Sequence, residues 1–278
     1  MTGPSHRTRP TAPPPSPEPL PGEVFDSHCH LDAMGCREPA EVAAAVALAR
    51  AVGVRRVVTV GDTVESSEWC VRAAGGHPDV YAAVAVHPNE VGGIGEAAYQ
   101  RIRLLAENPR VRAIGETGLD YYWGRVDPAA QQEAFRRHIA IAKQTHRALV
   151  IHDRDAHEDV LRILAEEGAP EWTVFHCFSG NADMAGICVD RGYVLSFAGP
   201  ITFTNAPMLR EAVRVVPIDQ LLVETDAPFL TPHPHRGRPN GPQMIPLIVR
   251  AICMEKRVEL GTLCAAISVT GQRVFGAW

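Results

Sequence analysis

Short apolar runs rich in β-branched residues recur eight times along the chain, separated by longer stretches in which apolar residues return every three or four positions. The first pattern is typical of buried strands and the second of helices that bury one face. The expected strands are Val24–Leu31, Arg55–Gly61, Val80–His87, Val111–Thr117, Ala148–Asp153, Trp172–Cys177, Tyr193–Ala198 and Leu221–Asp226. The expected helices are Pro39–Val52, Val64–Ala74, Ile94–Glu107, Pro128–Thr145, Ala156–Glu167, Asn181–Asp190, Ala206–Val215, Pro242–Lys256 and Glu259–Val274.

This alternation predicts a parallel sheet covered by helices. A strand in such a sheet is buried on both faces, so nearly all of its residues are apolar. Eight strand–helix units close naturally into one (β/α)8 TIM barrel. The alternative is an open doubly wound sheet, which carries a glycine-rich phosphate-binding turn after its first strand. Here Asp-Ala-Met-Gly follows that strand at 32–35, and no G-x-G-x-x-G or G-x-x-x-x-G-K motif occurs. We therefore expect a barrel without a nucleotide cofactor.

Proline is concentrated at the N-terminus, where the first 22 residues hold eight of the 23 prolines. This segment offers few apolar side chains for burial, and it lacks the run of about 7–15 apolar residues that a secretory signal needs. We expect residues 1–22 to form a disordered tail. The remaining residues, 23–278, have the length of one barrel.

Charge and cysteine content narrow the function classes. The chain has 27 basic and 32 acidic side chains and a formal net charge of −5, which argues against a broad basic surface for duplex nucleic acid or anionic membranes. Its seven cysteines include no Cys-x-x-Cys pair, and no window approaches about 18 consecutive apolar residues. We expect free thiols and a cytoplasmic protein without membrane contact.

Five expected strands end in residue types that bind metals, at the end of a barrel where active sites lie. These ends read Asp26-Ser27-His28-Cys29-His30, Gly115-Glu116-Thr117-Gly118, Ile151-His152-Asp153-Arg154, Phe175-His176-Cys177 and Val223-Glu224-Thr225-Asp226. Alternation along the first strand places His28 and His30 on one face and Cys29 on the other. Burying four imidazoles and two carboxylates together without a cation would be costly. The predicted metal ligands are His28, His30, Glu116, His152, His176 and Asp226.

Six ligands exceed the four of one tetrahedral ion, so we expect two divalent ions. We assign His28 and His30 to one ion, His152 and His176 to the other, and Glu116 as the bridge. Zn²⁺, Mn²⁺, Fe²⁺ and Co²⁺ suit such a mixed donor set; Mg²⁺, which prefers more oxygen ligands, stays open.

Two metal ions bound side by side favour hydrolysis, because they activate water and neutralise charge on a phosphoryl or carbonyl oxygen. Asp226 is the candidate general base, and Glu116 shares the catalytic centre. No G-x-S-x-G motif occurs and no cysteine stands in an evident catalytic motif. Cys177 is expected to point away from the metal side, as a thiol of the core.

Four segments resemble, in the same order, motifs of the TatD family of metal-dependent hydrolases. They are Asp26-Ser27-His28-Cys29-His30-Leu31, Gly115-Glu116-Thr117-Gly118-Leu119-Asp120-Tyr121-Tyr122, His176-Cys177-Phe178-Ser179-Gly180 and Glu224-Thr225-Asp226-Ala227-Pro228-Phe229. The resemblance covers the chain after the tail. It implies an amidohydrolase-like barrel, two divalent ions and phosphodiester cleavage in DNA, commonly from a 3′ end. The metal positions of the family fall on the same six residues.

The loop after the eighth strand departs from the family pattern. It usually resembles R-G-K-R-N-E-P, whereas this chain has Arg236-Gly237-Arg238-Pro239-Asn240-Gly241-Pro242. Arg238 and Asn240 retain chemistry suited to phosphate. Pro239 and Gly241 replace a basic and an acidic residue, which puts substrate specificity in question.

Further substrate contacts are expected around the same mouth. Arg154 and Arg238 are candidates for binding phosphate, and His87 for bonding to substrate or orienting a metal ligand. Tyr121, Tyr122 and Trp123 follow the fourth strand, where an aromatic ring could stack on an unpaired base or pack the loop. With a net charge of −5, single-stranded or frayed DNA ends suit the chain better than duplex, and no obligate protein partner is implied.

Two other function classes stay open. The same metal pair could hydrolyse an amide, a lactone or an aminoacyl ester, although related barrels often bridge their metals with a modified lysine where this chain has Glu116. A binding protein with a degenerate site is less favoured, because all six ligand positions keep competent side chains.

Overall fold

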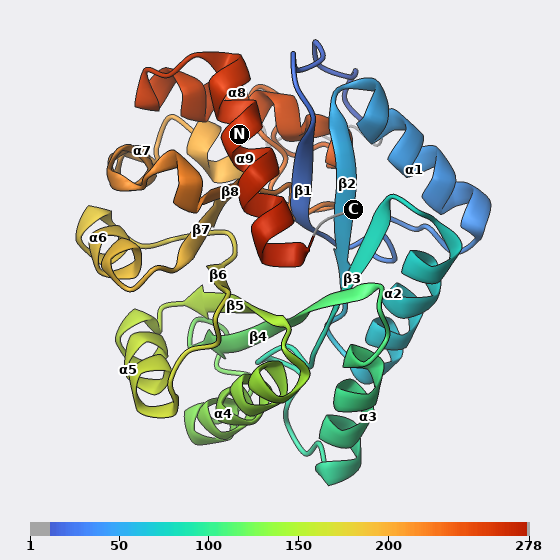
Figure 1. Ribbon diagram of the computed structural model, residues 1–278, viewed down its shortest axis with the longest axis vertical. Helices are drawn as coiled ribbons and strands as arrows, with labels where there is room; N and C mark the ends of the chain where they lie inside the picture. The colour runs from blue at the N-terminus through green and yellow to red at the C-terminus, as the bar shows by residue number, and fades with distance from the viewer. Residues whose placement is uncertain (1–11, 277–278) are drawn as a thin grey trace, which may run out of the picture.

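A computed structural model describes residues 12–276, which form an eight-stranded parallel barrel surrounded by helices (Figure 1). The strands are β1 (Val24–Cys29), β2 (Val54–Val60), β3 (Val80–Val84), β4 (Val111–Asp120), β5 (Ala148–Arg154), β6 (Thr173–Phe175), β7 (Val194–Phe197) and β8 (Leu221–Val223). The helices are α1 (Pro39–Ala51), α2 (Val64–Gly76), α3 (Glu96–Ala106), α4 (Pro128–Thr145), α5 (His157–Glu167), α6 (Ala182–Asp190), α7 (Pro207–Val215), α8 (Ile245–Lys256) and α9 (Leu260–Phe275). Each strand pairs in parallel with the next, which confirms the predicted TIM barrel.

Local signals in the sequence set where several helices begin. Thr63 caps α2 by accepting a hydrogen bond from the Ser66 N–H, and Asn181 caps α6 in the same way from the Met184 N–H. Asp127 caps α4, whose first residue is Pro128, a position where proline costs no hydrogen bond. No helix among residues 12–276 is both long and apolar enough to cross a membrane.

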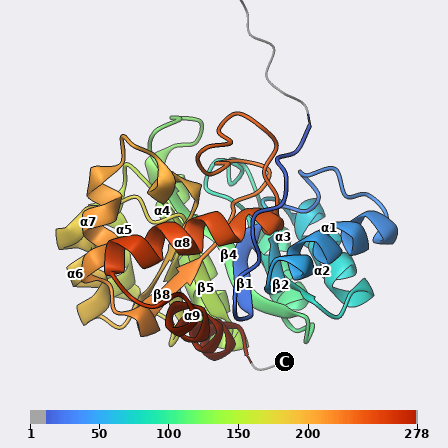
Figure 2. The same ribbon diagram turned by 90° about the horizontal axis from the view of Figure 1, so that it is seen from above.

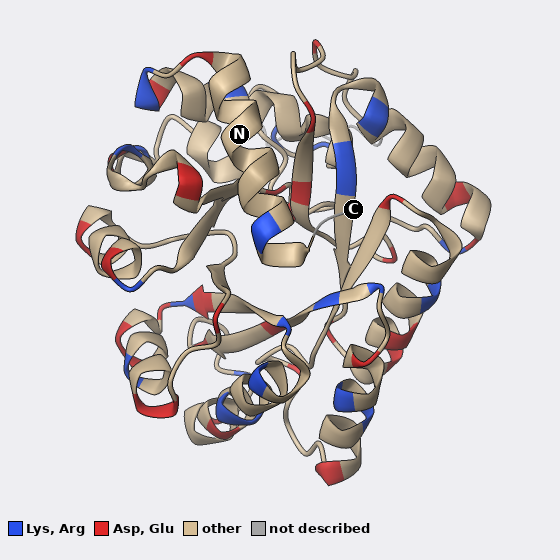
Figure 3. Ribbon diagram, in the orientation of Figure 1, with Lys and Arg blue, Asp and Glu red and all other residues tan. Residues whose placement is uncertain are grey.

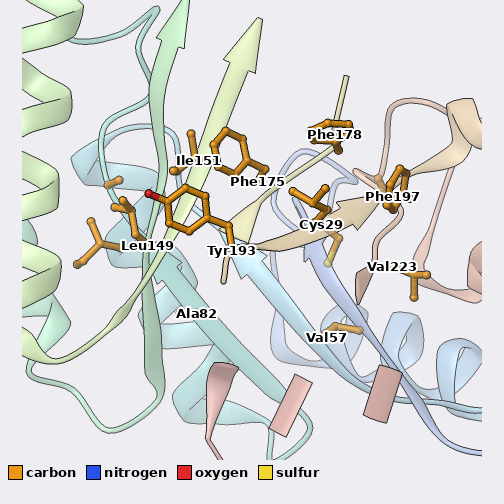
Figure 4. Close-up of a cluster of buried hydrophobic side chains, with 14 of the residues drawn as sticks. Cys29, Val57, Ala82, Leu149, Ile151, Phe175, Phe178, Tyr193, Phe197 and Val223 are labelled. Carbon is orange, nitrogen blue, oxygen red and sulfur yellow. The ribbon is translucent and has the colours of Figure 1, made fainter. Parts of the chain in front are cut away.

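Two layers of apolar side chains hold the barrel together. Alternate strand residues such as Val58, Tyr81 and Val150 pack inside the barrel, where Phe275 of α9 joins them. Figure 2 shows α9 at one end of the barrel and the loop after β8 at the other. The second layer lies between the strands and the outer helices, and Figure 4 shows part of it around Cys29 and Phe175. Cys29 therefore faces away from the barrel interior, as the alternation predicts.

Irregularities interrupt β1 and β4 at the predicted metal ligands. From Asp26 to Cys29 the chain advances three residues while β2 advances two, and from Ile114 to Thr117 it advances three while β5 advances two. Such β-bulges re-aim side chains and are common beside active sites. Gly115 permits the second bulge, because a Cβ there would lie 2.6 Å from the Cβ of Val150.

Hydrogen bonds join β1 to the segment after β8 and bring Asp226 beside the β1 histidines. The Asp226 N–H donates to the His28 carbonyl at 2.9 Å, and the His30 N–H donates to the Ala227 carbonyl at 2.7 Å. The buried Asp26 carboxylate accepts from the N–H and the hydroxyl of Thr225 at 2.9 and 2.5 Å. The seam between first and last strand thus assembles part of the site.

The expectation of a disordered tail over residues 1–22 is wrong for residues 12–22, which lie against the barrel; residues 1–11 fall outside the described part. Leu20 is buried and its N–H donates to the Val52 carbonyl. Arg238 donates to the carbonyls of Ala12 and Pro13, and Arg250 to those of Glu18 and Pro19. Prolines have little conformational entropy to lose, so these few contacts suffice to order the segment.

Deleting residues 1–17 is expected to lower the free energy of unfolding by about 1–2 kcal/mol. The deletion removes both carbonyl partners of Arg238 and the buried side chain of Pro14. Denaturant unfolding of the full and shortened chains measures the change. Arg238→Ala in the full chain serves as the matched control and should reproduce part of it. Equal stability of all three proteins would contradict the docking of this segment.

Candidate metal centre

Four donor atoms from β1, from β4 and from the segments that follow β1 and β8 lie close together, and we call them donor group 1: His28 Nε2, His30 Nε2, Glu116 Oε2 and Asp226 Oδ1. The two imidazole nitrogens lie 3.2 Å apart. Glu116 Oε2 lies 3.3 Å from His28 Nε2 and 3.8 Å from His30 Nε2. Asp226 Oδ1 lies 3.9 and 3.5 Å from the same atoms. Two nitrogens and two carboxylate oxygens at this spacing suit a divalent cation.

The other oxygen of Glu116 belongs to a second set, donor group 2, which comprises Glu116 Oε1, His152 Nδ1 and His176 Nε2. Glu116 Oε1 lies 2.5 Å from His152 Nδ1 and 2.8 Å from His176 Nε2. The two nitrogens are 3.5 Å apart. One carboxylate therefore faces two separate sets of histidines, the arrangement expected of a bridging ligand.

Hydrogen bonds to the opposite ring nitrogens orient three of the four histidines. His30 Nδ1 lies 3.1 Å from the Val60 carbonyl, His176 Nδ1 lies 3.0 Å from Glu224 Oε1, and His152 Nε2 lies 3.1 Å from Asp120 Oδ2. Each of these oxygens accepts a hydrogen bond from a ring N–H, so in the neutral ring the lone pair belongs to the other nitrogen, which lies in the donor group. Metal-binding histidines in proteins are oriented in this way.

His28 is held by packing instead. Its ring stacks on that of His176 with centroids 3.9 Å apart, and its buried Nδ1 has no hydrogen-bond partner among the described residues. The donor atoms of the two groups and the orientation of their rings fit bound metal ions.

The pKa values show how strongly the carboxylates act on the histidines. Burial alone would lower the pKa of His30, but Asp62, Asp226 and Glu116 outweigh it and raise the pKa to about 10. Burial likewise opposes the rise of the His152 pKa to about 9, which Glu116 and Asp120 cause. The pKa of His28 instead falls to about 4, because burial and the neighbouring His176 disfavour its charged form.

The carboxylates respond in the opposite direction. Burial would raise the pKa of Glu116, but His176, His87 and His152 hold it well below its usual range. Burial also opposes the lowering of the Asp120 pKa to about 2, which its bond with His152 produces. Both side chains therefore carry negative charge at neutral pH and attract cations.

A cavity of about 600 Å³ opens above the donor groups and exposes them to substrate. Its volume lies in the range of small-ligand sites. The lining residues outside the donor groups include Asp62, Glu90, Trp123, Arg125, Arg154, Cys177 and Phe229. The site thus combines metal-binding groups, a few arginines and two aromatic rings.

The predicted substrate residues divide into two pairs. Arg154 and His87 line the cavity, and His87 Nε2 lies 3.5 Å from Glu116 Oε1. Arg238 and Asn240 do not appear in its lining: Arg238 bonds to the N-terminal segment, and the Asn240 amide donates to the carbonyls of Thr225 and Phe229. In this structure Asn240 braces the backbone that carries Asp226, and its contact with substrate stays a prediction.

Sequence reasoning missed Asp120 and Glu224 as residues that orient ligands. Glu224 has the same strand parity as Asp226, and this signal could have placed it on the metal side. Asp120 is the last residue of β4, whereas the strand was expected to end at Thr117. Its position beside His152 could therefore be recognised only once the full length of β4 was known.

The expectation for Cys177 was wrong, because its side chain lines the cavity and is only partly buried. The regular strand ends at Phe175, so alternation no longer applies two residues later. Cys177 has a φ of 41°, which turns the backbone into the left-handed region.

A sequence profile of the family described as "TatD related DNase" matches residues 25–276. The chain belongs to the TatD family. A relative in Mycobacterium tuberculosis, named an uncharacterized metal-dependent hydrolase TatD, is 51% identical over 82% of this chain and 89% of its own length. The Bacillus subtilis hydrolase YabD, also named as uncharacterized and metal-dependent, is 37% identical over 91% of this chain and 98% of its own length.

Solved structures agree on the fold. The TatD homologue YjjV from Escherichia coli superposes with a TM-score of 0.86 at 24% identity, covering 92% of this chain and 98% of its own. A TatD family hydrolase from Entamoeba histolytica gives a TM-score of 0.78 at 17% identity, covering 91% and 98%. The expected family membership and barrel are confirmed, and this chain is a metal-dependent hydrolase.

Glu224→Gln is expected to weaken metal binding by about 10-fold, because it keeps the side-chain volume but removes the charge that orients His176. Titration of the purified protein against a competing chelator measures the affinity. Glu65→Gln, at an exposed position of α2, is the matched control and should leave it unchanged. An unaltered affinity in Glu224→Gln would show that His176 needs no such support.

Proposed function

We propose that this TatD family member is a phosphodiesterase that removes nucleotides from single-stranded or frayed DNA ends, in the 3′ to 5′ direction, with two divalent ions. The observation that carries the proposal is that the two oxygens of Glu116 belong to two different donor groups beneath one cavity. The family description as a DNase supports the substrate. Two ions bound there would make water reactive near neutral pH and neutralise charge on phosphoryl oxygens, and Zn²⁺, Mn²⁺ and Mg²⁺ are the candidates.

Asp226 is placed to accept the proton of the attacking water. Its carboxylate is 14% exposed, so it meets the cavity while its Oδ1 lies within donor group 1. The residue has a φ of 52°, a left-handed conformation that aspartate tolerates better than most side chains. Its backbone bond to His28 holds that conformation. A carboxylate fixed in this way can move a proton from water toward the leaving oxygen.

His87 is suited to donate a hydrogen bond to the substrate. The Asn89 N–H donates to His87 Nδ1 at 3.0 Å, so in the neutral ring the proton belongs to Nε2. That Nε2 lies 3.5 Å from Glu116 Oε1, at the floor of the cavity. We infer that it donates to a phosphoryl oxygen held at the donor groups.

Arg154 is suited to bind the adjoining phosphate. Its guanidinium stacks on the Tyr122 ring at 3.9 Å and makes no hydrogen bond or ion pair within residues 12–276. Stacking uses the face of the guanidinium and leaves its N–H edge free for a phosphate. Acidic and basic residues are interspersed along the outer helices (Figure 3), which supports binding at this mouth rather than on a broad basic surface.

Comparing single-stranded, frayed and blunt duplex DNA with Mn²⁺, Mg²⁺ or Zn²⁺ restored one at a time tests the proposal. We expect mononucleotide release from single strands at least about 10-fold faster than from blunt duplex, because a paired end must first lose base pairing and stacking before one strand can enter the cavity alone. The panel includes RNA and an aminoacyl ester, which represents carbonyl hydrolysis. Faster turnover of the ester than of any DNA would overturn the proposal.

We also propose a cytoplasmic location and DNA ends as the partner. All seven cysteines are free thiols, which suits a reducing compartment. No protein partner is required for this chemistry, because every proposed role lies within one chain.

A further inference from the structure

Two large aromatic side chains line the cavity without being packed away. Trp123 is 51% exposed and Phe229 is 56% exposed, and both belong to the cavity wall. Rings of this size normally bury most of their surface. Exposed rings beside a polar metal centre indicate a planar or apolar part of a ligand.

The two rings come from opposite sides of the barrel. Trp123 follows β4 and Phe229 follows β8, and in an eight-stranded barrel ordered β1 to β8 these strands are half a turn apart. Glu116 lies on β4 itself, and its carboxylate reaches the histidines of β1 and β5 and of the segments after β1 and β6. A ligand held at Glu116 therefore has one aromatic ring on each side.

Each ring is tied to one donor group. The Phe229 ring lies 6.1 Å from His30 of donor group 1, and its backbone is held by the Asn240 amide, which donates to the Phe229 carbonyl at 2.6 Å. On the other side, Asp120 Oδ1 accepts a hydrogen bond from the backbone N–H of Trp123 at 3.3 Å, and Asp120 Oδ2 is hydrogen-bonded to His152 of donor group 2. Both rings are thus positioned relative to the metal ligands before substrate arrives.

The charges around Trp123 suit a nucleotide. The Arg125 guanidinium lies 5.1 Å from the centroid of the Trp123 ring, and that of Arg154 lies 5.5 Å from it. A base on this ring would therefore have a guanidinium close to its own phosphate. No described cation stacks on Phe229, so its ring offers stacking alone.

We infer that the cavity grips two successive nucleotides, with one base stacked on Phe229, the other on Trp123, and the bond to be cleaved between them. This inference rests on the proposed nuclease function. Stacking accepts any base, and it requires both bases to leave their neighbours, which a paired duplex resists. The two rings therefore give a physical reason for a preference for unpaired ends.

Single-stranded oligonucleotides with an abasic residue at the last or at the penultimate position test the two contacts separately. Phe229→Ala and Trp123→Ala are each expected to raise KM for the intact strand by about 5- to 100-fold, with a smaller change in kcat. In each alanine variant, KM should no longer depend on the base that stacked on the missing ring, but it should still rise when the other base is removed. The missing ring and that first base stack on each other in the wild type, so losing both costs no more than losing one. Phe229→Tyr and Trp123→Phe should restore most of the affinity. Met254→Ala, an exposed apolar position on α8, is the control and should match the wild type.

A second readout does not require turnover. Binding of the intact strand to metal-free protein should quench tryptophan fluorescence, and Trp123→Phe should remove most of that quenching. The stacking inference is overturned, with the proposed function intact, if the wild type cleaves abasic and intact strands equally well, or if both alanine variants lose as much on abasic as on intact strands. If the metal-loaded wild type cleaves no DNA at all, both the function and this inference are wrong.

Discussion

Replacing Glu116 with alanine should reduce kcat by at least about 10³-fold and leave the barrel folded. Glu116 contributes one oxygen to each donor group, so its loss would weaken both proposed metal sites at once. Loss of a residue that only orients a ligand costs about 10- to 100-fold, and loss of a ligand shared by two sites should exceed this. Metal content measured on the purified protein should fall together with the rate.

The control for this variant is Glu90→Gln, which removes another carboxylate from the cavity wall without touching either donor group. It should keep wild-type metal content and nearly wild-type kcat. Circular dichroism of both variants checks the fold. Wild-type activity in Glu116→Ala would rule out a bridged pair of ions.

Asp226→Asn should lower kcat by about 10²- to 10⁴-fold even when metal is added in excess. Asparagine keeps the shape and tolerates the left-handed backbone at this position, but its amide cannot accept the proton of the attacking water. The measurement is kcat at saturating metal and substrate, with metal content determined in parallel. KM should change much less than kcat, because the substrate contacts proposed for Arg154 and His87 are untouched.

Two outcomes would change the assignment of Asp226. If excess metal restores kcat, Asp226 acts only as a ligand and another group accepts the proton. If kcat stays within a few-fold of the wild type at normal metal content, the residue has neither role. Glu90→Gln again serves as the matched control, because Glu90 also lines the cavity but belongs to neither donor group.

The order of strands and helices was predictable because each burial pattern is local. The helix Pro128–Thr145 has the expected bounds, and the remaining elements begin or end within a few residues of their predicted positions. Strand ends were the least predictable part, since a strand ends where its pairing ends. β4 runs on to Asp120, where its last residues pair with β5, whereas β8 stops at Val223.

The same distinction applies to the site. Residue types at successive strand ends were enough to predict both sets of histidines and the shared position of Glu116, and the structure brings those six side chains together. Side chains beyond the strands were harder to predict. Arg238 bonds to carbonyls of residues 12 and 13, more than two hundred positions away, and nothing in the local sequence indicates that contact.

The sequence by itself determined the barrel, the family and the six side chains that gather as candidate metal ligands, because burial periodicity and strand order decide which residues meet at a barrel mouth. Only the tertiary structure decided which nitrogen of each histidine belongs to a donor group, that Asp120 and Glu224 orient two of the rings, and that Trp123 and Phe229 follow strands on opposite sides of the barrel. Those features depend on bulges, loop conformations and hydrogen bonds between distant segments. Their energies arise only when the segments are packed together, so no local pattern in the chain records them.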